Sequence, residues 1–125
     1  MSIWFITGVS SGFGRALAEV LLQNDHTVVG TVRNEKDRAS FEKLAPGRAI
    51  AVLMDVTDET TVRRGIADVE SKVGPIAVVV NNAGYGFEGA IEEAPLDEVR
   101  RQFEVNVFGP VAVMKAVLPF MRKRR

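Results

Sequence analysis

The chain has 125 residues, enough for one domain with a single core, and its 46% hydrophobic content is ordinary for a globular protein. Sixteen basic residues balance sixteen acidic ones, so no overall field favours nucleic acid or an anionic membrane as partner. The lack of cysteine excludes disulfides and thiolate chemistry. No apolar run predicts a signal peptide or a membrane span, and we expect a cytoplasmic protein.

The glycine-rich stretch from Thr7 to Gly14 organises the first third of the chain. The apolar run Ile3–Ile6 predicts a strand that leads into it, and amphipathic spacing predicts a helix that follows. Gly8 allows a tight turn, Gly12 keeps a side chain away from a phosphate, and Gly14 lets the helix pack closely. Unpaired N–H groups at the start of that helix would bind a pyrophosphate, which predicts a dinucleotide ligand. The alternative is a plain turn, because the spacing departs from the general dinucleotide fingerprint.

The rest of the chain alternates apolar runs with amphipathic segments. Strands are expected at Ile3–Ile6, His26–Val32, Ala49–Met54 and Ile76–Val80. Helices are expected from the glycine turn, from Asn34 to Leu44, from Asp58 to Gly74 and from Pro95 onward. This order predicts one dinucleotide-binding domain over residues 1–125. Its fold class is α/β, a partial doubly wound, Rossmann-like parallel sheet with strand order 3-2-1-4 and helices on both faces.

Two helices carry expectations about burial. Helical spacing in the first predicts a buried stripe made of Phe13, Leu17, Val20 and Leu21. In the last, Asn106 predicts a change of direction into a helix over residues 107–122. That helix has one apolar stripe of Val107, Val111, Met114, Leu118 and Met121 and another of Phe108, Val113, Val117 and Phe120. Two stripes predict burial on more than one side.

His26 is the only histidine and has no cluster of other potential ligands around it in the sequence. It therefore reads as a surface residue at the start of a strand, and no metal site is expected.

Four motifs, in this order, resemble the short-chain dehydrogenase/reductase family over essentially the whole chain. They are Thr7-Gly8-x-x-x-Gly12-x-Gly14, Asp55-Val56, Asn81-Asn82-Ala83-Gly84 and Asn106-Val107. The resemblance implies the cofactor-binding half of an oxidoreductase that acts on a carbonyl or alcohol. The residues expected to bind the cofactor are Thr7, Gly8, Ser10, Ser11, Gly12, Phe13 through its backbone N–H, Gly14, Arg33, Asn34, Asp55, Val56, Asn82, Ala83 and Gly84.

The same resemblance implies roles for three individual residues. Asp55 is expected to accept from the adenine amino group, or else only to cap a turn before the next helix. Asn106 is the catalytic residue implied, holding the water of a proton relay; the alternative is a polar break between two helices. Gly84 would line the nicotinamide side of the cleft, or serve only a positive φ.

Charge predicts which cofactor is preferred. An NAD-selective site needs a carboxylate at the end of the second strand, but that position is Val32, followed by Arg33. The planar guanidinium of Arg33 pairs with a 2′-phosphate and stacks on adenine, and Ser10 and Asn34 add hydrogen bonds. We therefore expect NADP(H) in preference to NAD(H); the alternative is a solvated surface arginine.

The family's catalytic Ser and Tyr-x-x-x-Lys have no counterpart in these residues. Tyr85 is the only tyrosine, and Gly89 stands at the fourth position after it. We expect these residues alone to be inactive, as the cofactor-binding half of an NADP(H)-dependent oxidoreductase; the alternative is a non-catalytic, self-associating dinucleotide-binding fragment. A homo-oligomer is expected in either case, through the unprotected edge at Ile76–Val80 or through the last helix, which in the family commonly contributes to a subunit interface. A third route is the exchange of that helix between chains.

Overall fold

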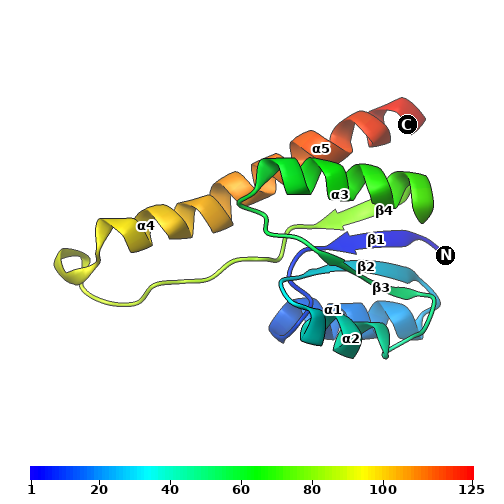
Figure 1. Ribbon diagram of the computed structural model, residues 1–125, viewed down its shortest axis with the longest axis horizontal. Helices are drawn as coiled ribbons and strands as arrows, with labels where there is room; N and C mark the ends of the chain where they lie inside the picture. The colour runs from blue at the N-terminus through cyan, green and yellow to red at the C-terminus, as the bar shows by residue number, and fades with distance from the viewer.

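A four-stranded parallel sheet with helices on both faces forms the body of the computed structural model, which describes all 125 residues (Figure 1). The strands are β1 (Ile3–Ile6), β2 (Thr27–Val32), β3 (Ala49–Leu53) and β4 (Ile76–Val80). The α-helices are α1 (Gly12–Gln23), α2 (Glu35–Glu42), α3 (Glu59–Lys72), α4 (Leu96–Phe103) and α5 (Gly109–Arg124), with a 3₁₀ turn at Ile91–Glu93 and a π-helical segment at Glu104–Phe108. The sheet order β3-β2-β1-β4 confirms the predicted topology.

Each face of the sheet has its own core, because successive side chains of a strand point to opposite faces. Phe5 belongs to the core beneath α3 and α5, together with Ile66 and Val113. Ile6, the next residue, belongs to the core beneath α1 and α2, together with Phe41. This arrangement leaves the carboxyl ends of the strands open between the two helix layers.

The predicted buried stripe of α1 is wrong at two positions. The side chain of Phe13 is 89% exposed and that of Val20 is 54% exposed. The residues that α1 buries are Gly14, Ala18, Leu21 and Leu22, so Leu21 of the predicted stripe is buried, and Leu17 is half-buried. Small residues at positions 14 and 18 bring the helix close to the sheet, and this rotates the buried face away from Phe13.

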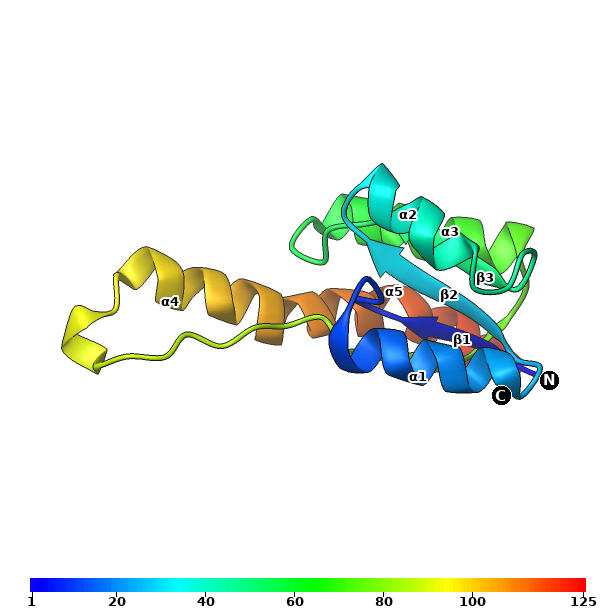
Figure 2. The ribbon, with the colours of Figure 1, turned by 90° about the horizontal axis from the view of Figure 1, so that it is seen from below.

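The predicted change of direction at Asn106 is also wrong. A π-helical segment joins α4 to α5, so residues 96–124 form one continuous helix. The α4 half projects from the body as an arm in both ribbon views (Figures 1 and 2). This helix is long and apolar enough to cross a membrane, a test that core helices of soluble proteins also meet. In the structure, 17% of its most apolar stretch is buried.

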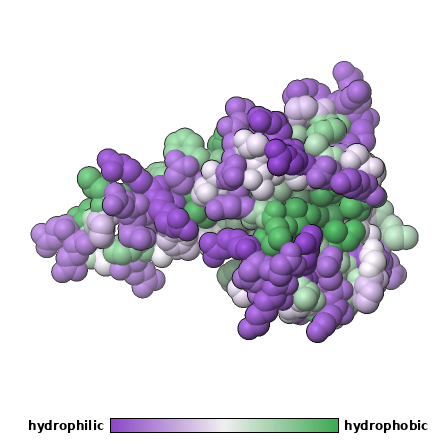
Figure 3. Space-filling model, in the orientation of Figure 1, coloured by the Kyte–Doolittle hydropathy of each residue, from purple (hydrophilic) through white to green (hydrophobic).

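Only one side of α5 is buried, contrary to the prediction of two. Val113 and Val117 are buried against α3 and the sheet. In the other stripe only Met121 packs partly against the core, and Val107, Val111, Met114 and Leu118 are each between 41% and 46% exposed. Apolar surface also gathers over the sheet between the two helix layers in Figure 3.

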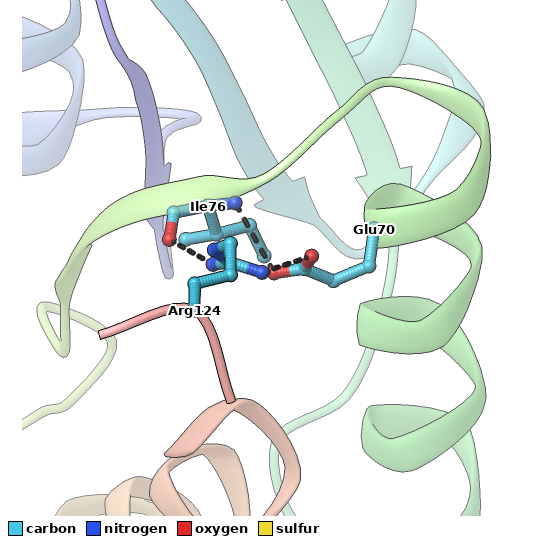
Figure 4. Close-up of polar contacts among 3 residues, drawn as sticks. All are labelled: Glu70, Ile76 and Arg124. Carbon is cyan, nitrogen blue, oxygen red and sulfur yellow. Dashed lines mark hydrogen bonds and ion pairs between the residues drawn. The ribbon is translucent and has the colours of Figure 1, made fainter. Parts of the chain in front are cut away.

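An ion pair fastens the far end of α5 to the body (Figure 4). The Arg124 guanidinium donates to both carboxylate oxygens of Glu70 on α3, at 2.7 and 3.1 Å, and to the carbonyl oxygen of Ile76 at 2.8 Å. Glu70 also accepts from the backbone N–H of Ile76 at 3.1 Å. The last turn of α5, the end of α3 and the first residue of β4 are therefore joined by one polar network.

Candidate dinucleotide-binding site

A crevice of about 630 Å³ opens at the carboxyl ends of the strands. All the residues predicted to bind the cofactor line it except Thr7 and Gly14. The lining also includes residues that no motif indicated, namely Thr31, Asp37, Met54, Arg101 and Val105. In an open α/β sheet this is where ligands bind, at the point where the strand order reverses between β1 and β4.

Glycine is required in the turn between β1 and α1 for two different reasons. Gly8 and Gly12 have φ of 75° and 63°, in the left-handed region that favours glycine. At Gly14, an added Cβ would collide with the carbonyl oxygen of Gly8 and lie 2.5 Å from Asn82 Nδ2. The predicted close packing at Gly14 is therefore against the turn itself and the loop after β4.

Two buried threonine hydroxyls fix the floor of the crevice. Thr7 Oγ1 accepts from the backbone N–H groups of Asn82, at 3.0 Å, and Ala83, at 2.9 Å. Thr31 Oγ1 accepts from the N–H of Gly8 at 2.9 Å. Asn82 Nδ2 donates to the carbonyl oxygen of Gly8 at 2.9 Å. These bonds hold the ends of β1, β2 and β4 in one rigid arrangement before any ligand binds.

Asp55 presents an ionised acceptor at one end of the crevice. Its Oδ1 accepts from the backbone N–H of Thr57 at 2.9 Å and from the Thr57 hydroxyl at 2.7 Å. These hydrogen bonds lower the pKa of the Asp55 carboxyl, partial burial opposes them, and Arg33 and Arg101 lower it further. The cap of α3 is a different residue, Asp58, which accepts from the N–H of Thr61 at 3.2 Å. Asp55 therefore forms a turn but leaves Oδ2 without a partner in the chain.

Arg33 and Asn34 lie side by side at the end of β2 but differ in what they leave free. Asn34 caps α2, since its Oδ1 accepts from the N–H of Asp37 at 2.8 Å, while its Nδ2 donates to the Asp37 carboxylate at 3.0 Å. Arg33 forms no ion pair, is exposed and lines the crevice. The cation free to meet a ligand at this strand end is thus Arg33.

Asn106 connects the loop after β4 to the long helix. Its Oδ1 accepts from the N–H of Tyr85 at 2.9 Å, and its Nδ2 donates to the carbonyl oxygen of Tyr85 at 2.6 Å. An added Cβ on Gly84 would lie 2.7 Å from Asn106 Oδ1, so the loop can approach this closely only with glycine there. Its catalytic role stays a prediction.

His26 has a structural environment away from the crevice. Its Nδ1 accepts from the backbone N–H of Ser2 at 3.1 Å, and its ring lies edge-on to Trp4 with centroids 6.0 Å apart. The ring is half-buried at the opposite end of the sheet, where it steadies the start of β1.

The model of the short chain dehydrogenase family matches residues 2–125. The chain belongs to this family. It is 41% identical, over 123 residues, to a 3-ketodihydrosphingosine reductase of Bacteroides thetaiotaomicron; the match covers 98% of this chain and 43% of that protein. The chain therefore spans less than half the length of this curated relative.

Solved structures of other proteins share the fold of this chain. A short-chain dehydrogenase from Streptomyces avermitilis superimposes with a TM-score of 0.93 and 43% identity, over 98% of this chain and 45% of that one. A blue fluorescent protein from a metagenomic library, solved in complex with NADPH, gives a TM-score of 0.84 and 27% identity, over 94% of this chain and 50% of that one. The family binds nicotinamide dinucleotides and small-molecule substrates.

Proposed function

We propose that these residues are the cofactor-binding half of an NADP(H)-dependent oxidoreductase acting on a carbonyl or alcohol. The observation that carries the proposal is that one crevice collects the glycine turn, the free oxygen of Asp55 and the unpaired guanidinium of Arg33. A reductase among the relatives and a neighbour holding NADPH support the same direction. We place this activity in the cytoplasm, on the cysteine-free and charge-balanced composition.

The choice of NADP(H) rests on charge. A side-chain acceptor for a ribose 2′-hydroxyl would have to come from the end of β2, but the side chain of Val32 has no polar atom. Arg33 provides two parallel N–H donors, which suit a 2′-phosphate. The cap on α2 occupies the side chain of Asn34, so Arg33 supplies most of the discrimination we propose.

The crevice residues would bind and orient the cofactor, whose nicotinamide supplies the hydride when bound. The N–H groups at the start of α1 take the diphosphate, and Asp55 Oδ2 accepts from the adenine amino group. Asn106 holds the backbone of Tyr85 at the wall of the crevice and is the residue we assign to the water of a proton relay. Proton transfer to a substrate oxygen needs an acid of lowered pKa, and Tyr85 has Gly89 where a lysine would stand. On their own, these residues should bind the cofactor without turning over a carbonyl.

Self-association is part of the proposal. The exposed stripe of Val107, Val111, Met114 and Leu118 presents apolar side chains along α5. Contiguous apolar surface of this kind favours a second copy of the chain, since its burial contributes about 25 cal/mol per Å². The second candidate function, a non-catalytic dinucleotide-binding protein that self-associates, shares this surface and is favoured by the residues at Tyr85 and Gly89. The coding sequence past Arg125 distinguishes the two, because only an oxidoreductase would continue into a strand followed by a Ser and a Tyr-x-x-x-Lys.

Substitution of Gly12 tests the site. Gly12→Val would place a branched side chain at positive φ and toward the phosphate, so we expect NADPH binding to be lost in calorimetry. Gly47→Val is the matched control: Gly47 also has positive φ with open space around it but lies outside the crevice. The free energy of unfolding should fall by a similar amount in the two variants, and only Gly12→Val should lose NADPH binding. Equal NADPH binding by the two folded variants would refute the site.

A further inference from the structure

Arg101 is a cation on the wall of the crevice that belongs to none of the family motifs. It lies in the last turn of α4, with an exposed side chain and no ion pair. Its neighbour Arg100 has a different setting: its guanidinium lies 4.0 Å from the Asp97 carboxylate, and it does not line the crevice. Of two adjacent arginines, therefore, only Arg101 is available to a ligand there.

Arg101 and Arg33 approach the crevice from opposite sides. Arg33 leads into α2, which covers the same face of the sheet as α1. Arg101 belongs to the continuous helix that includes α5, which covers the other face together with α3 (Figures 1 and 2). A ligand that lies between the two helix layers thus meets one guanidinium from each layer.

Asp55 lies at the end of the crevice that these two arginines share. Both guanidinium charges act on its carboxyl, and its Oδ2 has no partner in the chain. Val56 and Val105 add apolar surface to the same lining. Planar guanidinium groups stack on aromatic rings, and a carboxylate accepts from an exocyclic amino group. These groups together match a flat base with an amino group on its edge, and in the proposed nicotinamide dinucleotide that base is adenine.

We propose that Arg101 contacts the adenine ring of the cofactor from the α4 side of the slot. The inference rests on the proposed function, because it assumes that a dinucleotide binds in the crevice. Adenine is common to both nicotinamide dinucleotides, so Arg101 strengthens the binding of NADP(H) and NAD(H) alike. This separates it from Arg33, whose proposed partner is the 2′-phosphate. The contact also anchors α4, which otherwise projects from the body.

The test measures dissociation constants by nicotinamide fluorescence for NADPH, NADH and reduced nicotinamide mononucleotide, which has no adenine. Arg101→Ala should raise the dissociation constants of NADPH and NADH by the same factor, roughly three- to thirtyfold, and leave the mononucleotide unchanged. Arg101→Lys keeps the positive charge but lacks the planar guanidinium group. This variant should therefore still bind both dinucleotides more weakly than the unchanged chain does. Arg100→Ala removes the same charge one position earlier and should change each constant by less than about twofold.

Each other outcome overturns the inference. If Arg101→Ala weakens the binding of NADPH but not that of NADH, Arg101 contacts the 2′-phosphate. If Arg101→Lys binds both dinucleotides as tightly as the unchanged chain, the effect is one of charge in general. Unchanged binding of both dinucleotides would mean no contact at all. In each of these cases the unchanged chain still binds NADPH, and the proposed function stands. If the unchanged chain binds neither dinucleotide, the proposed function fails and the inference fails with it.

Discussion

The side-chain amide of Asn106 pairs with both backbone polar groups of Tyr85, accepting from the N–H at 2.9 Å and donating to the carbonyl oxygen at 2.6 Å. An asparagine amide has the same donor and acceptor groups as a peptide unit. The two bonds therefore resemble the pair of hydrogen bonds that joins residues on neighbouring β-strands. It ties the loop after β4 to the π-helical segment between α4 and α5. Because Gly84 in that loop lines the crevice, the pair helps to shape this wall of the crevice.

Removal of the amide should loosen this loop. Asn106→Ala loses both bonds to Tyr85, and hydrogen exchange of the Tyr85 amide should become about tenfold faster, the effect of roughly one lost hydrogen bond. Asn24→Ala is the control, since Asn24 Nδ2 donates to the carbonyl oxygen of Val20 at the far end of α1. If the Tyr85 amide exchanges at the same rate in both variants, the pair does not hold the loop.

The network of Glu70 and Arg124 should contribute measurably to stability. The Glu70 side chain is 7% exposed, so Arg124→Ala leaves a nearly buried carboxylate with only the Ile76 N–H as partner. We expect urea denaturation to show a loss of about 1–3 kcal/mol in the free energy of unfolding. The exposed pair of Glu59 and Arg63, at 4.0 Å, provides the control. Arg63→Ala should change the free energy by less than about 0.5 kcal/mol, and equal losses in the two variants would contradict the assignment.

Charge on the open stripe of α5 should prevent self-association. We expect light scattering after size exclusion to give at least twice the chain mass of 13.7 kDa for the unchanged protein. Val111→Glu should reduce this to the mass of one chain, because a buried carboxylate opposes the contact. Val20→Glu makes the same change at an exposed valine of α1 and should leave the mass unchanged. A single-chain mass for the unchanged protein at high concentration would rule out the interface.

Local sequence was enough to predict the sheet. The strands β1 and β4 have the predicted bounds because a short apolar run with a turn beside it has few other structures available. The strand order followed from the glycine turn and the alternation of strands and helices. Most residues predicted to bind the cofactor line one crevice because they lie near strand ends, which meet at one edge of a parallel sheet.

The errors lie where distant residues decide the local structure. Asn106 looked like a break between two helices, but its partner Tyr85 is 21 positions away and no local pattern reveals that pair. Apolar spacing predicts a buried Phe13 because it cannot show that Gly14 packs against the turn. No local pattern points to Thr31 or Arg101, since a strand threonine and a helix arginine come to line the crevice only through the fold.

The most direct measurement is a fluorescence titration of the unchanged chain and of Arg33→Ala with NADPH and with NADH. We expect the unchanged chain to bind NADPH more tightly than NADH. Arg33→Ala should weaken the binding of NADPH by roughly ten- to a hundredfold, because it removes a charge-assisted contact. The affinity for NADH should stay nearly unchanged. Arg63→Ala removes a surface arginine of α3 that lies outside the crevice and should change neither constant. Equal affinity of the unchanged chain for the two cofactors would contradict the proposed preference for NADP(H).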